Sequence, residues 1–281
     1  RLIAQFSIAQ KPEPAIGKAI YDFVHLRDTT KLDKPYKEAM VLLVGRDASV
    51  YKSLTKQLQT EAMINDVRDQ IKKAPDPNHV ALTITGGRIV SDEDIYQYRS
   101  EKKLYMEFNV INYYLVEDLL PVINWKITAD TLSFGTLHCQ KATAHFRGRD
   151  YEAWFCPELP FHSGPWKLNG LPGLILQARD SKGEVQFNFA GFEDISKQSL
   201  TIAPPADDIR ATLADIERLK AARKADPAGF ARAAHGSGQA KRTSSGLDMV
   251  DPSKIQSIDV HKSSDGYSAV INNPIELPEK K

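Results

Sequence analysis

The 281-residue chain has 37 Lys and Arg residues against 36 Asp and Glu residues, so its net charge is +1. This balance provides no field that would attract nucleic acid or an anionic membrane surface. Hydrophobic residues make up 42% of the chain and charged residues 26%, a composition typical of a globular domain with a sizeable core. No apolar run approaches the roughly 18 residues of a membrane-spanning helix, so we expect no transmembrane segment.

The first nine residues, "RLIAQFSIA", form an apolar stretch that ends in small residues at Ser7 and Ala9. Signal peptidase cleaves after this pattern. We therefore interpret residues 1–9 as a signal-peptide remnant and Gln10 as the mature N-terminus, with an N-terminal β-strand as the alternative. No cysteine follows the small residues, so we expect export without a lipid anchor.

Apolar and polar residues alternate over much of the chain, which is the period of β-strands. We expect strands, in chain order, over residues 19–27, 39–44, 80–85, 94–100, 103–108 and 112–117, with another beginning at 125–127. The first two form an antiparallel ribbon through the polar loop "DTTKLDKP". Between the second and third strands the apolar spacing lengthens to that of a helix, so we predict a helix over residues 50–71.

The segment "CQKATAHFRGRDYEAWFC" (residues 139–156) alternates on both sides of Arg147-Gly148, which predicts a hairpin with a two-residue turn. In this register the numbers of paired residues sum to 295, so Cys139 lies opposite Cys156. Directly opposed Cβ atoms are about 4.5–5.5 Å apart, near enough for a bridge after small adjustment. An exported protein meets an oxidising compartment. We therefore predict a Cys139–Cys156 disulfide, with two free buried cysteines as the alternative.

The stretch "GPWKLNGLPGLILQARD" (residues 164–180) combines turn residues with apolar ones. Pro172-Gly173 suits a tight turn, and Leu174, Ile175 and Leu176 then enter a buried strand. This strand begins a hairpin with arms at 174–178 and 184–192. The stretch contains neither a phosphate-binding loop nor a nucleophile elbow.

The character of the chain changes over residues 204–250. An amphipathic helix is expected within 204–226, and the small, polar "GSGQAKRTSSG" that follows indicates a flexible loop. Closing strands are expected at 254–261 and 267–277. Together these elements predict an α+β fold, predominantly antiparallel with two or three helices, in one domain over residues 10–281 that carries the 204–250 insertion.

The segment "GLPGLIL" (residues 170–176) resembles the signature of the GLPGLI family, secreted envelope proteins of Gram-negative bacteria. The "GRDYEAW" and "GPWK" elements before it, the early "YDF" and the "NPIEL" ending are also similar. The resemblance covers nearly the whole mature chain, although Cys156 departs from it, because a Thr-like residue is commoner there.

The resemblance implies a periplasmic location or one at the periplasmic face of the outer membrane. It implies a bowl or half-barrel similar to the N-terminal bowl of one class of bacterial N-glycanase. It also implies a receptor-type outer-membrane β-barrel as partner. The family has no established biochemical function.

We assign no catalytic residue. His145 faces Asp150 across the predicted hairpin, but a cross-strand pair on the surface explains this arrangement. The binding candidates are two aromatic residues and two basic residues at the hairpin tip: Trp154, Trp166, Arg147 and Arg149. The His and Cys spacing fits no zinc motif, so we expect no metal site and no cofactor.

We therefore interpret the chain as a non-enzymatic binding or accessory protein of the envelope. It would partner an outer-membrane β-barrel receptor or hold an apolar ligand. The alternative is a hydrolase or the accessory domain of one, glycanase-like, and a further alternative is a metal-handling protein. An apolar cavity would favour the ligand carrier, whereas an uncovered strand edge would favour the partner-binding protein.

Overall fold

A computed structural model describes residues 11–76, 78–88, 90–110, 112–226, 229–230, 254–261 and 270–279. Over these residues the elements are β1 Glu13–Pro14, β2 Gly17–His25, β3 Tyr36–Val44, β4 Ala48–Ser53, α1 Leu54–Lys73, β5 Val80–Thr85, β6 Glu93–Tyr98, β7 Lys103–Asn109, β8 Tyr113–Leu119, β9 Lys126–Phe134, β10 Leu137–Phe146, β11 Arg149–Cys156, β12 Leu174–Asp180, β13 Val185–Asp194, β14 Thr201–Ile202, β15 Ile209–Arg210, α2 Leu213–Ala225 and β16 Ile255–His261. The predicted signal remnant and the loop "GSGQAKRTSSG" lie outside the described residues.

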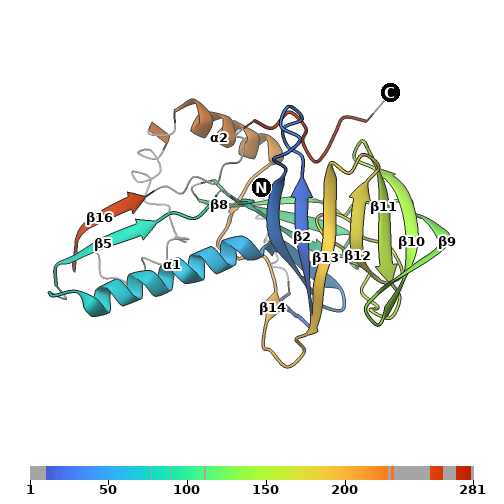
Figure 1. The fold of residues 1–281 in the computed structure, drawn as a ribbon, viewed down its shortest axis with the longest axis horizontal. Helices are drawn as coiled ribbons and strands as arrows, with labels where there is room; N and C mark the ends of the chain where they lie inside the picture. The colour runs from blue at the N-terminus through green and yellow to red at the C-terminus, as the bar shows by residue number, and fades with distance from the viewer. Residues whose placement is uncertain are drawn as a thin grey trace, which may run out of the picture.

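Twelve strands form one sheet in the order β15-β8-β7-β6-β4-β3-β2-β13-β12-β11-β10-β9. Every pair in it is antiparallel except β15 with β8, which is parallel. The sheet is open, because β9 and β15 stand at its two ends and do not pair with each other in the part that is described. The expectation of a β-rich, predominantly antiparallel α+β fold is therefore confirmed, and the sheet is not a closed barrel (Figure 1).

The core follows from the alternation of side chains along the strands. In β2, Ala19, Tyr21 and Phe23 are buried while the residues between them are more exposed. The predicted buried strand after the glycine-rich turn is confirmed, since Leu174 and Leu176 of β12, and Ile175 between them, are 0% exposed. Both faces of β12 are covered there, which explains why three apolar residues stand in a row.

The first helix begins later than predicted. Residues 48–53 form β4, because Val50 and Tyr51 pair with β3 and β6, and the helical spacing over 50–71 is correct only from Leu54 onward. Ser53 ends the strand and caps the helix, its Oγ accepting from the Lys56 amide at 2.8 Å. Figure 1 shows α1 extending away from the large sheet beside β5 and β16.

The second helix also starts later than the apolar spacing predicts. Residues 209–210 form β15, and α2 begins at Leu213 behind Thr212, which makes a capping box with Asp215. Ile216 is 0% exposed and belongs to the main core, and the Lys220 ammonium lies 4.7 Å from the centre of the Phe108 ring. The helical part of the predicted insertion therefore packs on the sheet.

The two predicted closing strands differ in outcome. Residues 255–261 form β16, which pairs with β5 in parallel. The described residues 270–277 are not a strand, which corrects that prediction. Their polar groups bond to side chains and loop carbonyls, and no neighbouring strand provides a ladder for them. Among the described residues no helix has the length and apolar character needed to cross a membrane.

Candidate functional site

The glycine-rich stretch between β11 and β12 forms a loop inside the sheet, residues 157–173, and Trp166 lies at its centre. Trp166 is 5% exposed and contacts the rings of Phe146, Tyr151 and Phe187, with centroid distances of 5.6, 6.5 and 6.5 Å. The structure therefore places this binding candidate in the core and not at a surface where a ligand would stack.

This loop ties distant parts of the sheet together. The Gln97 side chain donates to the Trp166 carbonyl at 2.9 Å, and the Tyr21 hydroxyl donates to the Ile175 carbonyl at 2.8 Å. Asn169 holds the segment that joins β8 to β9, since its carbonyl accepts from the Trp125 indole at 2.8 Å. A Cβ on Gly173 would lie 2.2 Å from the Cys156 carbonyl oxygen, so glycine is required at that position.

The predicted register of the hairpin β10–β11 is confirmed. The pairs run from Gln140 with Phe155 to Phe146 with Arg149, and each pair of numbers sums to 295. Arg147 and Gly148 form the turn with φ of 50° and 72°, as a two-residue hairpin turn with two positive φ angles requires.

The two cysteines stand one step beyond the last of these pairs. Both thiols are buried and free in the structure. Burial raises the pKa of Cys139 to about 12, and the adjacent Cys156 adds to the shift. The disulfide stays a prediction. Because both thiols are buried in apolar surroundings, neither has the environment of a reactive nucleophile.

Arg149 does not project into solvent as a tip residue was expected to do. Its side chain is 2% exposed and pairs with Asp180 at 2.7 Å and with Glu184 at 3.0 Å. Arg149 also donates to the carbonyls of Pro274 and Ile275 at 2.8 and 3.0 Å. Its charge is therefore neutralised inside the protein, so it is no surface contact for an external anion.

The other charged groups of the tip also meet the C-terminal segment. Arg147 is 42% exposed, with its Nε 3.8 Å from Glu276. His145 lies between two carboxylates, Asp150 at 2.6 Å and Glu279 at 2.8 Å. The hydrogen bond to Asp150, and to a smaller extent the one to Glu279, raises the pKa of His145. The pairing of His145 with Asp150 is the one expected from the register.

Trp154 lies on the outer face of the sheet and is half-buried. The Lys141 ammonium is 6.0 Å from its ring centre, and Lys141 pairs with Glu152 at 3.1 Å. Of the four binding candidates, Arg147 and Arg149 lie at the hairpin tip. Trp166 lies in the core against Phe146, next to that tip. Trp154 lies apart from these three residues.

Sequence reasoning missed two acidic residues. Glu38 is 2% exposed and accepts hydrogen bonds from the hydroxyls of Tyr36, Ser53 and Ser91. Burial raises the pKa of Glu93 to about 7 against the opposing charges of Lys167 and Lys220. The signal for Glu38 was available, because it occupies an inward position in the alternation of residues 36–44.

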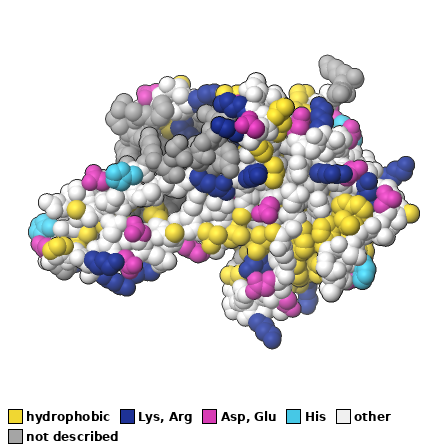
Figure 2. Space-filling view, in the orientation of Figure 1, with side chains coloured by type: hydrophobic (Ala, Val, Ile, Leu, Met, Phe, Trp, Pro, Cys, Tyr) yellow, Lys and Arg dark blue, Asp and Glu magenta, His cyan; other side chains and the backbone are white. Residues whose placement is uncertain are grey.

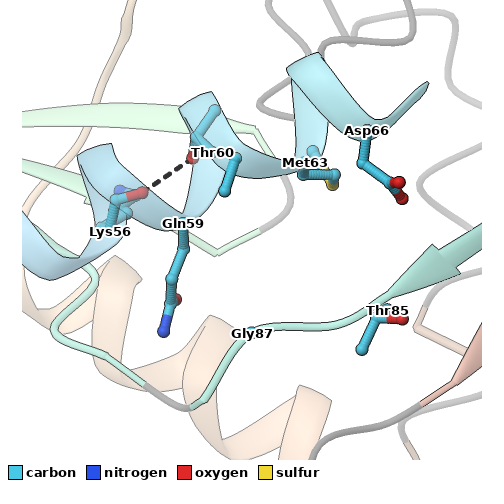
Figure 3. Close-up of a pocket in the computed structure, with 8 residues that line it drawn as sticks. Lys56, Gln59, Thr60, Met63, Asp66, Thr85 and Gly87 are labelled. Carbon is cyan, nitrogen blue, oxygen red and sulfur yellow. Dashed lines mark hydrogen bonds between the residues drawn. The ribbon is translucent and has the colours of Figure 1, made fainter. Parts of the chain in front are cut away.

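A cavity of about 530 Å³ opens between α1 and the chain that follows β5. It is lined by Lys56, Gln59, Thr60, Ala62, Met63, Asp66, Thr85 and Gly87 (Figure 3). The Thr60 hydroxyl is used within the helix, since it donates to the Lys56 carbonyl at 2.9 Å. The lining contains no His, Ser or Cys that a carboxylate would activate, and so resembles no hydrolytic site.

One edge of the open sheet is β9, and most of this strand is exposed. Its pairing with β10 shifts between Gln140 and Ala142, where residues 128–130 form a bulge. In the bulge the Asp130 amide donates a hydrogen bond to the Thr128 hydroxyl, and the Gln140 side chain donates one to the Thr128 carbonyl. Side-chain groups therefore satisfy backbone groups of the bulge. Residues 131–134 remain as a regular, uncovered edge.

The uncovered edge carries apolar side chains on the side of the core. Leu132 lies opposite the buried Cys139, and Ile127 lies opposite the buried Ala142, yet Leu132 and Ile127 are 42% and 45% exposed. Phe134 is partly buried and contacts Phe189 with ring centres 5.8 Å apart. The alternation of a two-sided strand therefore continues to an edge where nothing described covers it.

Aromatic residues gather at the end of the sheet where β9 stops. Phe161 and Phe192 are partly buried, with ring centres 6.0 Å apart, beside the Phe134–Phe189 pair. Figure 2 shows hydrophobic side chains gathered over β12 and β13, with charges of both signs around them. Over the residues that the structure describes, no group of three His, Cys, Asp or Glu side chains is placed to hold a metal ion.

Comparison with known proteins gives a family match and several similar solved chains. The model of a family described as "Protein of unknown function (Porph_ging)" matches residues 146–177, the segment from the hairpin tip through the glycine-rich loop into β12. Two crystal forms of PNGF-II, in space groups C2 and P21, are similar at 12% identity and a TM-score of 0.48. They cover 73% of this chain, which spans 32% and 33% of theirs, about a third of their length. No curated protein matches the chain.

Proposed function

We propose that this chain is a non-enzymatic binding protein of the bacterial cell envelope, and that it binds a partner protein through the free edge of β9. The observation that carries the proposal is the exposure of Leu132 and Ile127 on the core side of a strand that has no further neighbour among the described residues. A partner strand paired with residues 131–134 would extend the sheet and cover Leu132. The predicted signal-peptide remnant and the GLPGLI resemblance support an envelope location, with an outer-membrane β-barrel receptor as the proposed partner.

Backbone groups at this edge are available for such a strand. Phe134 and Leu137 flank the two-residue turn and form a pair, so the next pair, Ser133 with His138, is one without mutual hydrogen bonds. In agreement, the His138 amide donates to Glu158 on its other side at 3.1 Å. The amide and carbonyl of Ser133 therefore point away from β10, toward the open edge.

The bowl shape expected from the resemblance has geometric support. Residues 120–125 join β8 to β9, and a chain of this length reaches at most about 25 Å. Ten strand spacings separate β8 from β9 in the sheet order, roughly 48 Å if the sheet were flat. A curved sheet would bring these two strands within reach, and this supports the open half-barrel that we propose.

The same interior argues against an apolar ligand as the main cargo. Trp166, Leu168 and Leu171 of the inner loop are each at most 5% exposed and fill the inner face. The buried Glu38 accepts hydrogen bonds from three hydroxyls, so a structural role accounts for it. Both observations favour the partner-binding protein over the ligand carrier and the hydrolase.

Photo-crosslinking in the native cells tests the proposal. A photoreactive amino acid at Ser133, on the edge, should give an adduct with another envelope protein, whereas the same group at Arg179 should not. Arg179 is the matched control because it lies on the outer face of β12 and its side chain is 60% exposed.

Substitutions at the edge make the test sharper. Leu132→Lys should abolish the Ser133 adduct, since a lysine at a strand edge opposes strand addition. Leu132→Val keeps an apolar β-former there and should preserve the adduct. The proposal fails if Ser133 gives no adduct, or if Ser133 and Arg179 give the same one.

A further inference from the structure

The described C-terminal residues lie in a groove at the opposite end of β10 from the open edge. We call residues 272–279 the tail segment. The tail groove consists of the side chains and turn that receive it: His25, Arg27, His145, Arg147, Gly148, Arg149 and Lys167. The segment closes no sheet, and its contacts differ from those of a core strand.

The groove grips the backbone of the tail segment. Arg149 donates to the carbonyls of Pro274 and Ile275 and, at 2.6 Å, to the side-chain oxygen of Asn273. His25 donates to the Asn273 carbonyl at 2.8 Å, and the Arg147 carbonyl accepts from the Leu277 amide at 3.0 Å. These contacts fix the backbone around Asn273-Pro274, where residues 272–273 and 275–276 form bends.

The groove also selects charge. Lys167, whose side chain is 8% exposed, pairs with Glu276 at 2.6 Å. His145 pairs with one oxygen of Glu279 at 2.8 Å, and the Gly148 amide donates to the other at 3.1 Å. Two acidic side chains of the segment thus meet a lysine, a histidine and a turn amide, all of which donate hydrogen bonds to them.

Two side chains of the groove, Arg149 and His145, are positioned by residues outside the tail segment. Arg149 is held by Asp180 and Glu184, and His145 by Asp150, none of which belongs to the tail segment. Of the described residues 270–279, Asn273 alone is buried. The segment therefore contributes little apolar core, and polar contacts to preorganised donors hold it in place.

We propose that the tail groove is a peptide-recognition site for an acidic peptide that bends around an Asn-Pro pair, and that the tail segment occupies it as an exchangeable ligand. The site is separate from the β9 edge, and neither depends on the other. A protein that carries a segment of this chemistry would compete with the tail for the groove.

An exchange experiment on the full chain tests this inference. A specific protease sequence is introduced within residues 262–269 and cleaved, so that every part of the protein remains present. A fluorescently labelled peptide of residues 270–279, "VINNPIELPE", is then added in excess. The labelled peptide should enter the protein, and the native segment should be released while the near-ultraviolet circular dichroism of the protein stays unchanged.

Variants distinguish recognition from adhesion. A peptide with Glu276→Gln should bind about tenfold more weakly, because the charge-assisted bond to Lys167 is lost. Lys167→Met in the protein should have the same effect, whereas Lys197→Met, at an exposed lysine of the loop after β13, should have none. The inference is overturned if the cleaved segment never exchanges, if its release unfolds the protein, or if both lysine variants bind the peptide equally.

Discussion

Arg149 and Asp180 form an ion pair of 2.7 Å between side chains that are each 2% exposed. The pair joins the tip of β11 to the end of β12, and Glu184 adds a second carboxylate at 3.0 Å. A buried pair of this kind is costly to break, because the remaining charge cannot be solvated.

Replacing Arg149 should therefore destabilise the protein far more than replacing its neighbour in the turn. We expect Arg149→Met to lower the free energy of unfolding by about 3–5 kcal/mol, since the Asp180 carboxylate would stay buried without an opposite charge. Arg147→Met should cost less than about 1 kcal/mol, because the Arg147 side chain is 42% exposed and its Nε lies 3.8 Å from Glu276, which makes a weak ion pair. Urea unfolding measures both, and equal losses would contradict the assignment of Arg149 as the buried anchor.

The glycine-rich loop gives a second matched pair. A methyl group at residue 173 would overlap the Cys156 carbonyl, so Gly173→Ala should cost about 3 kcal/mol or more. Gly191→Ala places its methyl group where no atom lies within 4 Å and should change stability by less than about 1 kcal/mol. Thermal or urea unfolding of the two variants checks the difference, and a Gly173→Ala protein as stable as Gly191→Ala would refute the close approach.

His25 should make the protein sensitive to mild acid. Burial, assisted by the charge of Arg27, lowers the pKa of His25 from 6.5 to about 4. The unfolded chain takes up a proton below about pH 6.5 and the folded protein does so only near pH 4, so stability is full above pH 6.5 and falls between these values. The loss from pH 7 to pH 5 should be about 2 kcal/mol.

His25→Gln keeps a donor for the Asn273 carbonyl and removes the titration, so its unfolding free energy should vary less over this range. His138→Gln, at a residue whose side chain is 78% exposed, is the control and should retain the wild-type slope. If the His25→Gln and wild-type curves run parallel from pH 7 to pH 5, the histidine is not buried in its neutral form.

The cysteine pair can be tested by mass spectrometry without reductant. We expect protein isolated from the envelope to weigh two hydrogens less than the reduced form, because an oxidising compartment would join Cys139 to Cys156. The bridge should raise the unfolding free energy by about 3 kcal/mol over the reduced protein. Two free thiols in the exported protein would remove the disulfide prediction.

Local alternation was enough to predict most of the strands and one complete register. The hairpin of β10 and β11 was predictable because its turn and its inward residues agree on a single pairing, and a slip by one residue would turn Tyr151 outward. The beginning of α1 could not be predicted in this way. Tyr51 and Leu54 both fit a helical stripe, although Tyr51 belongs to a strand. The pairing of Tyr51 with Ile95 of β6 decides this, and such a contact between strands distant in sequence leaves no local signal.

The candidate sites were harder to predict than the fold. The sequence predicts Arg149 to be an exposed tip residue, because its partners lie elsewhere in the chain. One of them, Asn273, is 124 residues away. Trp166 was a binding candidate for the same reason, since the neighbours that place it in the core come from three different strands. The open edge of β9 has no sequence signal at all, because a central strand and an edge strand with the same alternation look alike.

The pairing of β2 with β13 also sets the order in which the molecule can mature. The Tyr21 hydroxyl bonds to the carbonyl of Ile175, 154 residues later in the chain. One edge of β2 therefore stays unpaired until β13, in the second half of the chain, is available. Contacts this distant in sequence close slowly, and until then the early ribbon of β2 and β3 exposes an unpaired border prone to aggregation. A chain built in this way depends on protection during its assembly, and we expect its yield to respond to chaperones more strongly than its final stability does.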